Sequence, residues 1–257
     1  MSNIADIAIK LFGDNSPCRC GGGHKICLKC EVCRANEPDE IYNSEAGIAA
    51  IIDATILKAN ATVEDVQALC AVANEHRTAS VCINSYFIPT IKALLAQGIK
   101  SCTVINFPLG ASSATAIAGE AAAVLKAGVD EVDMVQNLSA LLSGDLDAAF
   151  TSINGVAKLC NMESALLKVI LETCCLNDEQ IIISCLIAKK AGTKFVKTST
   201  GFGSAGATAA NIALMRKVVG PKLGVKASGG IRNREQGIEM ISAGANRIGA
   251  SSVTALL

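Results

Sequence analysis

Two lysines stand in nearly the same short phrase, FVKTSTG at 195–201 and GVKASGG at 224–230. In each phrase an apolar run of strand type delivers one lysine, and small, hydroxylated and glycine residues follow. Burying a lone ammonium is costly, so Lys197 and Lys226, 29 residues apart, suggest one shared pocket. There each positive charge would make the other amine harder to protonate. A neutral lysine is the nucleophile of Schiff-base chemistry, and the two phrases therefore indicate an enzyme.

Two further charged residues precede these lysines at similar intervals. Asp133 lies 35 residues before Lys168, and Lys168 lies 29 residues before Lys197. Each interval is about the length of one strand and one helix. In a parallel barrel, polar residues at the carboxyl ends of neighbouring strands converge on one face. We therefore expect three amines and a carboxylate to share a small volume. The alternative is that one or two of them face solvent.

Short β-rich runs alternate with helical patterns from about Ile48 onward. An Ala-Gly pair at 127, 191 and 243 ends a helix and leads into a strand each time, as a glycine cap would. Eight strands alternating with helices predict a (β/α)₈ TIM barrel over residues 44–257. A doubly wound open sheet is the main rival, but no Gly-x-Gly-x-x-Gly phrase opens a helix after the first strand. The expected strands are 51–57, 80–84, 101–106, 131–136, 166–172, 194–198, 223–227 and 247–249.

Several phrases resemble those of the deoxyribose-phosphate aldolase family, and they recur in the family's order between about 44 and 252. They are IDATILK (52–58), SVCIN (80–84), NFPLG (106–110), DEVDMV (130–135), LKVILET (167–173), FVKTSTGF (195–202) and GVKASGGIR (224–232). The resemblance implies a class I aldolase that interconverts 2-deoxy-D-ribose 5-phosphate with acetaldehyde and D-glyceraldehyde 3-phosphate. It also implies that catalysis uses no cofactor.

The resemblance implies a role for each charged residue. Lys197 corresponds to the Schiff-base lysine, and Lys226 to the second lysine, whose charge helps to keep the first deprotonated. Asp133 corresponds to the carboxylate that moves protons, and Lys168 to a residue that supports it. Asp53 and Thr55 are expected to position substrate hydroxyls or the second lysine. Position 54, often His in the family, is Ala here. We do not expect proton transfer from the tyrosine-bearing tail that some members carry.

A phosphate anchor is expected beyond the last strands. Backbone N–H groups of glycine turns, serine hydroxyls and a short helix start form a good anion cradle, and barrels commonly bind phosphate after strands seven and eight. The alternative is that the glycine-rich segments after these strands are tight turns that require glycine and bind no anion. The expected substrate- and phosphate-binding residues, besides Asp53 and Thr55, are Thr200, Gly201, Gly229, Gly230, Gly249, Ser251 and Ser252.

Residues 1–43 are expected to lie outside the barrel, as a short helix over 1–12 and a cysteine-rich segment. Soft ligands at close spacing suit a structural zinc ion, an iron–sulfur cluster would accept similar thiolates, and a flexible segment with spare thiols is equally compatible. The seven cysteines outside this segment are expected to be ordinary buried thiols. The candidate ligands are Cys18, Cys20, His24, Cys27, Cys30 and Cys33.

The composition of the chain limits which kinds of partner it can bind and where in the cell it is expected. The 23 basic residues balance 23 acidic ones with no basic run, which argues against nucleic acid. No apolar stretch approaches a membrane span, and the start lacks a signal-peptide pattern. We expect a cytoplasmic protein that binds sugar phosphates and aldehydes and forms homo-oligomers. The competing functions are a related Schiff-base barrel for another sugar phosphate, and a catalytically silent phosphate-sugar binder with a metal-binding interaction module.

Overall fold

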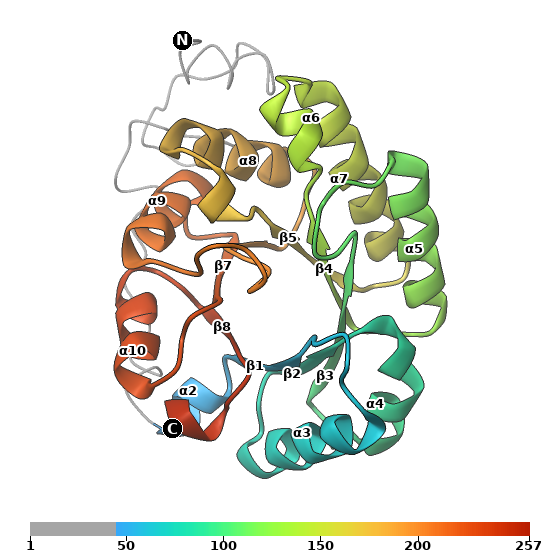
Figure 1. Ribbon diagram of the computed structural model, residues 1–257, viewed down its shortest axis with the longest axis vertical. Helices are drawn as coiled ribbons and strands as arrows, with labels where there is room; N and C mark the ends of the chain where they lie inside the picture. Colours follow the sequence, from blue (N-terminus) through green and yellow to red (C-terminus); the bar gives the residue numbers. More distant parts are fainter. Residues whose placement is uncertain (1–44) are drawn as a thin grey trace.

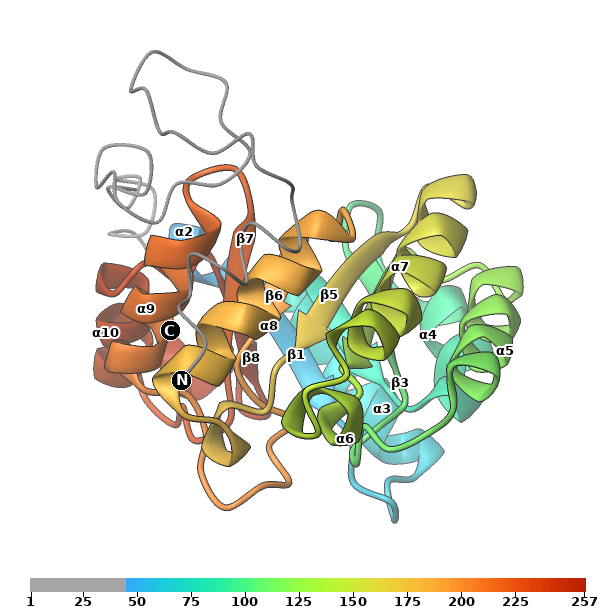
Figure 2. The ribbon, with the colours of Figure 1, turned by 90° about the horizontal axis from the view of Figure 1, so that it is seen from above.

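The computed structural model describes residues 45–257; the predicted extension and its candidate metal ligands lie outside this range. Eight parallel strands pair in chain order, and the last pairs with the first to close a barrel. Figure 1 shows this ring of strands with the helices outside it, and Figure 2 shows the same arrangement at right angles. The prediction of a (β/α)₈ barrel is confirmed, and the open sheet is excluded. The strands are β1 (Ile52–Ile56), β2 (Ser80–Ile83), β3 (Lys100–Ile105), β4 (Glu131–Val135), β5 (Leu166–Ile170), β6 (Phe195–Lys197), β7 (Gly224–Ser228) and β8 (Arg247–Ala250).

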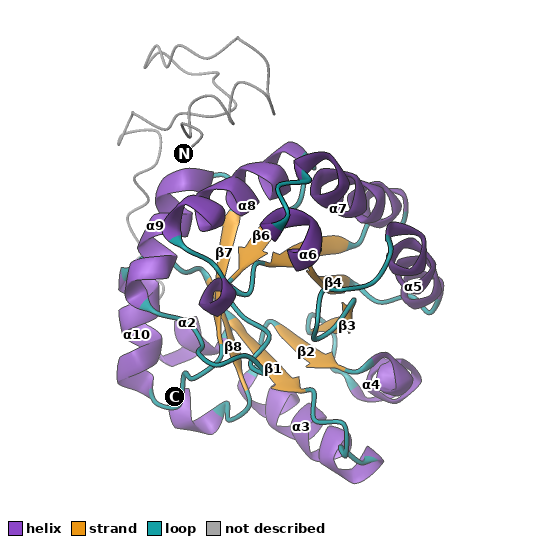
Figure 3. Cartoon of the chain, turned by 45° about the horizontal axis from the view of Figure 1, so that its top comes forward, coloured by secondary structure: helices purple, strands orange, loops and turns teal. Residues whose placement is uncertain are grey.

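Most of the helices begin at a side chain that caps one of their first free N–H groups. Thr62 accepts a hydrogen bond from Asp65 N–H while the Asp65 carboxylate accepts one from Thr62 N–H, and Asn177 and Gln180 form the same reciprocal pair. Figure 3 shows the helices packed around the strands. They are α2 (Glu45–Ala49), α3 (Val63–His76), α4 (Ile88–Leu94), α5 (Ala114–Lys126), α6 (Leu138–Leu142), α7 (Leu146–Met162), α8 (Asp178–Lys190), α9 (Ala209–Val219) and α10 (Arg234–Ser242). No helix within residues 45–257 is long and apolar enough to cross a membrane.

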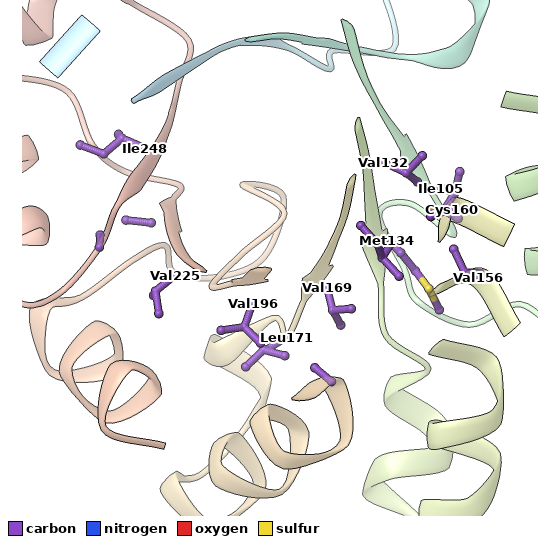
Figure 4. Close-up of a cluster of buried hydrophobic side chains, with 14 of the residues drawn as sticks. Ile105, Val132, Met134, Val156, Cys160, Val169, Leu171, Val196, Val225 and Ile248 are labelled. Atoms are coloured by element: carbon purple, nitrogen blue, oxygen red, sulfur yellow. The ribbon is translucent and has the colours of Figure 1, made fainter. Parts of the chain in front are cut away.

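The main hydrophobic core lies between the strands and the helices. Met134, Val169, Val196 and Val225 are fully buried there, with Ile248 completing the same cluster (Figure 4). Each such side chain contributes about 1.5–3 kcal/mol when it is removed from water. Because this layer lies on the helix side of the strands, the interior of the barrel is filled by other residues.

Strand alternation sends polar residues to the inside of the barrel. Successive side chains of a strand point to opposite faces, so Val132 and Met134 join the helix-side core while Glu131 and Asp133 face inward. Ala54 also belongs to the helix-side core. The alanine therefore replaces a residue that packs behind the strand, and the inward-facing Asp53 beside it is unaffected.

Candidate active site

A buried cluster of amines and carboxylates fills the middle of the barrel, with Asp133 at its centre. Lys168 Nζ lies 2.7 Å from Asp133 Oδ1, and Lys197 Nζ and Lys226 Nζ each lie 2.8 Å from Asp133 Oδ2. The four residues expected to converge therefore meet around one carboxylate. Their depth was predicted wrongly: Asp133, Lys168 and Lys226 occupy mid-strand positions, and Lys197 alone of the four ends its strand. Barrel interiors are filled by mid-strand side chains, and here that filling is charged.

A second tier of ion pairs lies toward the amino ends of the strands. Lys226 Nζ also donates to Asp53, whose other oxygen accepts from Arg247 at 2.8 Å. Arg247 also pairs with Glu131 at 3.1 Å, and Glu131 pairs with Lys168 at 2.6 Å. The buried charges are thus held in one continuous network, as buried charges must be if they are to be tolerated.

Glu131 and Arg247 are members of this network that were not anticipated from the sequence. Both occupy the first position of their strand, where a charged residue usually indicates a solvated strand end. A signal was present, because Glu131, Phe195 and Arg247 share the position four residues after the alanine of the repeated Ala-Gly pair. The three meet at the base of the barrel, where the Arg247 guanidinium lies 5.6 Å from the centre of the Phe195 ring.

Two glycines make room for this packing. A Cβ on Gly224 would overlap the Phe195 ring, so its absence lets the ring lie across the base of the barrel. A Cβ on Gly249 would lie 3.2 Å from Lys226 Cε and 3.1 Å from Ser228 Cβ. Because Gly249 has no side chain, there is room for the Lys226 side chain to extend to Asp53 and Asp133.

The network shifts the pKa values of its members in opposite directions. Burial alone would raise the pKa of Asp133, but Lys168, Lys197 and Lys226 outweigh it and hold that pKa well below its ordinary value. Asp53 has a lowered pKa for the same reason, since Lys226 and Lys168 offset its burial. Asp133 is therefore a carboxylate over the whole physiological range of pH.

The pKa values of Lys226 and Lys168 are shifted in the opposite direction, upward. Burial lowers the pKa of Lys226, yet Asp133 and Asp53 together raise it above its ordinary value. Burial also acts against the charge of Lys168, and Asp133, Cys102 and Asp53 reverse it, so that its pKa is raised as well. Lys226 is expected from its phrase to have a pKa lowered by its partner lysine, but the net shift is upward because two carboxylates surround its amine. The raised pKa agrees with the charged role that the family resemblance implies for Lys226.

Lys197 has fewer carboxylate contacts than the other bases of the cluster. Among the described residues its amine lies within 4 Å of Asp133 alone, whereas Lys168 reaches three carboxylates, and Lys226 and Arg247 two each. The cluster holds four basic groups against three carboxylates, so its charges balance when one amine is neutral. Lys197 is the least paired of the four, with one carboxylate contact.

The expected anion-binding turns follow β6, β7 and β8 at the same end of the barrel. Gly201, Gly229 and Gly230 have φ of 89°, 82° and 80°, values that side-chain-bearing residues rarely adopt. Ser251 and Ser252 are exposed just after β8. These turns follow three neighbouring strands, and a Cβ on Gly229 would lie 3.6 Å from Gly201 Cα, so the turns after β6 and β7 are adjacent.

Thr200, expected to bind substrate, is hydrogen-bonded to Glu172 instead. Its backbone N–H lies 3.3 Å from both carboxylate oxygens of Glu172, and its hydroxyl donates to Glu172 as well. The Thr200 hydroxyl oxygen then accepts from Phe202 N–H at 3.0 Å. Glu172, at φ 55° just after β5, therefore fixes the loop that follows Lys197, a link that the sequence did not indicate. Similarly, Thr55 donates its hydroxyl to the carbonyl of Asp53 at 2.8 Å.

Two cysteines complete the inner wall. Cys82 and Cys102 are register partners on β2 and β3, and with Asp133 they are a group within residues 45–257 whose donor atoms lie within 4.8 Å of one another. The Cys102 thiol donates to Asp133 Oδ1 at 3.4 Å, and Lys168 donates to the Cys102 sulfur at the same distance. The amines of Lys168, Lys197 and Lys226 already contact this carboxylate, and Lys168 and Lys226 are cationic, so the trio is a poor host for a cation.

A cleft of about 410 Å³ opens at the other end of the barrel, among the amino ends of β5 to β8. Leu166, Phe195, Gly224 and Asn246 are part of its lining. None of Asp133, Lys168, Lys197 and Lys226 is among the residues that line this cleft. Lys197 and the glycine turns lie at the opposite, carboxyl-terminal end of the strands.

A closed parallel barrel with a charged, lysine-lined interior defines the class as a (β/α)₈-barrel enzyme. Residues 47–257 match the DeoC/LacD family of aldolases. The chain belongs to this family.

Individual relatives agree with the family assignment. The chain is 50% identical over 211 residues to the deoxyribose-phosphate aldolase of Histophilus somni (strain 2336), an alignment that covers 82% of this chain and 93% of the relative. It is 50% identical to the Brevibacillus brevis deoxyribose-phosphate aldolase, covering 78% and 90%. The tetrameric deoxyribose phosphate aldolase structure from Aeropyrum pernix superimposes with a TM-score of 0.76 at 31% identity, covering 86% and 97%.

Proposed function

We propose that this chain interconverts 2-deoxy-D-ribose 5-phosphate with acetaldehyde and D-glyceraldehyde 3-phosphate through a Schiff base on Lys197. The observation that carries the proposal is the contact of Lys197 Nζ with Asp133 Oδ2, an oxygen that Lys226 also contacts. Deoxyribose-phosphate aldolases that are 50% identical to the chain supply the substrate class. A catalytically silent binder would have no use for an amine held against a carboxylate in this way.

Lys197 is the nucleophile in this mechanism. Its neutral amine attacks C1 of the open-chain sugar phosphate and forms a carbinolamine, which loses water to become an iminium ion. Asp133 lies within hydrogen-bond distance of the attacking nitrogen and is the group that moves the protons of these steps, directly or through one water. Lys226 remains cationic between Asp53 and Asp133, so that Asp133 stays ionised between proton transfers.

The iminium ion then serves as the electron sink for cleavage. The hydroxyl proton on C3 leaves to a base, the C3–O bond becomes a carbonyl, and the electrons of the C2–C3 bond move into the iminium to give an enamine. Glyceraldehyde 3-phosphate departs. The enamine gains a proton at C2, and water releases acetaldehyde and restores the Lys197 amine. Atoms and charge balance without any additional reactant except the water that was lost earlier.

The phosphate group of the substrate is assigned to the turns after β6, β7 and β8. Gly201, Gly229 and Gly230 present backbone N–H groups, and Ser251 and Ser252 add hydroxyls, as an anion cradle requires. Thr200 acts indirectly in this scheme, because its own donors are engaged by Glu172. Its contribution is to fix the turn that carries Gly201.

Borohydride trapping of the imine tests the proposal. Wild-type protein incubated with acetaldehyde and reduced should gain the mass of one ethyl group on a peptide that contains Lys197. Lys197→Met should abolish both this label and the retro-aldol rate, whereas Lys126→Met, on the exposed face of α5, should retain both. Unchanged labelling of Lys197→Met would remove Lys197 from its role. Labelling by another aldehyde in preference to acetaldehyde would favour a related Schiff-base barrel instead.

The extension over residues 1–43 is assigned a structural or interaction role that the aldolase chemistry does not need. This assignment rests on the sequence, because these residues lie outside the described range. A retro-aldol assay with and without a strong chelator should give equal rates, and metal analysis of the same samples reports whether the cysteines hold an ion. The tetramer formed by the Aeropyrum pernix relative supports self-association of this chain, which light scattering would measure.

A further inference from the structure

Two adjacent thiols, Cys174 and Cys175, stand apart from the other cysteines of the described residues. Cys70, Cys82, Cys102, Cys160 and Cys185 are buried, as expected, but Cys174 is half-buried and Cys175 is exposed. The prediction that all of these cysteines are ordinary buried thiols was therefore wrong for this pair. Their sulfur atoms lie 4.0 Å apart.

The pair occupies a short 3₁₀ turn, Thr173–Cys175, between β5 and α8. This turn is tied to the loop after β6, because Thr173 N–H donates to the carbonyl of Thr198 at 3.0 Å. Burial and the neighbouring Cys174 raise the pKa of Cys175 above its ordinary value. The Cys175 thiol is therefore of low reactivity near neutral pH toward simple alkylating agents, which attack the thiolate.

A disulfide between the two sulfurs would be strained. The Cα atoms of consecutive residues are about 3.8 Å apart, whereas disulfides usually join Cα atoms about 4.4–6.8 Å apart. A soft atom that bridges the two sulfurs avoids this strain, since it closes a larger ring. Thiol ligands select soft centres, so the geometry favours a thiophile with two free bonding positions.

We propose that Cys174 and Cys175 form a capture site for trivalent arsenicals, and that an occupied site slows the aldolase. An arsenoxide R–As=O reacts with the two thiols to give R–As(S–)₂ and one water. Two As–S bonds form, the arsenic–oxygen bond breaks, and the two thiol protons leave in the water. Arsenic stays in the +3 state, so no oxidant or reductant is needed.

The link to the active site runs through Glu172 and its loop. The Cys174 thiol lies 3.7 Å from Glu172 Oε1, to which it donates. A Cβ on Gly203 would lie only 2.7 Å from the Cys174 sulfur, so the loop backbone packs directly against this atom. An arsenic atom on Cys174 would displace the Gly203 backbone and disturb the contact between Glu172 and Thr200. The effect on rate rests on the proposed function, whereas capture of the arsenical does not.

Phenylarsine oxide is the probe, with Cys175→Ser as the variant. Native mass spectrometry of the full chain should show one more bound arsenical on the wild type than on Cys175→Ser, because the remaining cysteines are common to both proteins. Cys70→Ser, which removes a buried thiol on α3, should keep the wild-type number. The wild-type retro-aldol rate should fall at least fivefold with one equivalent, and that of Cys175→Ser should change by less than twofold. 2,3-Dimercaptopropanol should reverse the loss, and 2-mercaptoethanol should not.

Each readout can overturn one part of the proposal. Equal arsenical numbers on the wild type and Cys175→Ser would eliminate the capture site, and so would a vicinal disulfide, seen as a loss of two mass units, in place of the adduct. Capture without any change in rate would eliminate the link through Glu172. A wild type with no retro-aldol rate before the arsenical is added would instead defeat the proposed function, and the mass measurement would still decide the capture site.

Discussion

Lys197 at the end of β6 and Asp133 in the middle of β4 meet inside the barrel at 2.8 Å, although 64 residues separate them in the chain. Lys226 shares the same carboxylate oxygen at the same distance. One oxygen therefore faces both the amine proposed to react and an amine that stays charged. This arrangement gives the two lysine phrases different chemical roles.

Asp133→Asn should nearly abolish catalysis and weaken the fold. The carboxylate is the proton carrier of the proposed mechanism, a role whose loss costs on the order of 10²–10⁴ in rate. The variant also leaves three amines around an uncharged group, and breaking a buried pair costs about 3–5 kcal/mol. Steady-state retro-aldol rates and urea unfolding check the two parts. Asp147→Asn, exposed in the first turn of α7, is the control and should change the free energy of unfolding by at most about 0.5 kcal/mol.

The base of the barrel offers a double-mutant cycle. Arg247→Met should destabilise the protein by about 3 kcal/mol, because the buried carboxylates of Asp53 and Glu131 each lose a cationic partner. Glu131→Gln in the same background should restore part of the loss, with a coupling free energy of about 1 kcal/mol or more. Strict additivity of the two changes in urea unfolding would mean that the observed pair contributes no interaction energy.

Much of the fold was predictable because its signals are local. Glycine caps, capping boxes and β-branched runs placed each strand near its observed bounds, and the spacing of Asp133, Lys168, Lys197 and Lys226 indicated one shared site. The network around Asp53 was not predictable in the same way. Lys226 and Asp53 are 173 residues apart, and the number of carboxylates around an amine is a property of barrel closure. The two lysine phrases alone therefore do not predict the upward shift of the Lys226 pKa, although the family resemblance implies a charged Lys226.

The same network predicts a plateau of stability against pH. The pKa values of Asp53 and Asp133 are lowered on folding, so their stabilisation is present above the ordinary carboxyl pKa of about 4 and is lost as pH falls below it. The pKa values of Lys168 and Lys226 are raised, so their stabilisation is present below about 10.5 and is lost as pH rises beyond it. The contribution of these groups to the free energy of unfolding should be flat between about pH 5 and 10 and should fall on both sides. Urea unfolding from pH 3 to 11 measures this profile. If stability fell as steeply at acid pH in Asp53→Asn as in the wild type, Asp53 would contribute nothing to the acid side of the profile.

The path of the Lys226 side chain gives a prediction that separates catalysis from folding. Gly249→Ala places a methyl group 3.2 Å from Lys226 Cε and 3.1 Å from Ser228 Cβ, closer than packed atoms normally lie. Relief of this contact should move the amine away from Asp53 and Asp133. We expect kcat to fall about tenfold, with a loss of about 1–3 kcal/mol in the free energy of unfolding.

Gly155→Ala is the matched control for that substitution. Gly155 lies within α7 and a Cβ there would contact nothing within 4 Å, so alanine should raise the free energy of unfolding by about 0.5–1 kcal/mol without changing kcat. If Gly249→Ala lost stability but kept the wild-type kcat, the position of Lys226 would not be limiting for the reaction. A tenfold loss of kcat at an unchanged KM would instead show that the substrate still binds while Lys226 no longer contacts Asp133 correctly beside Lys197.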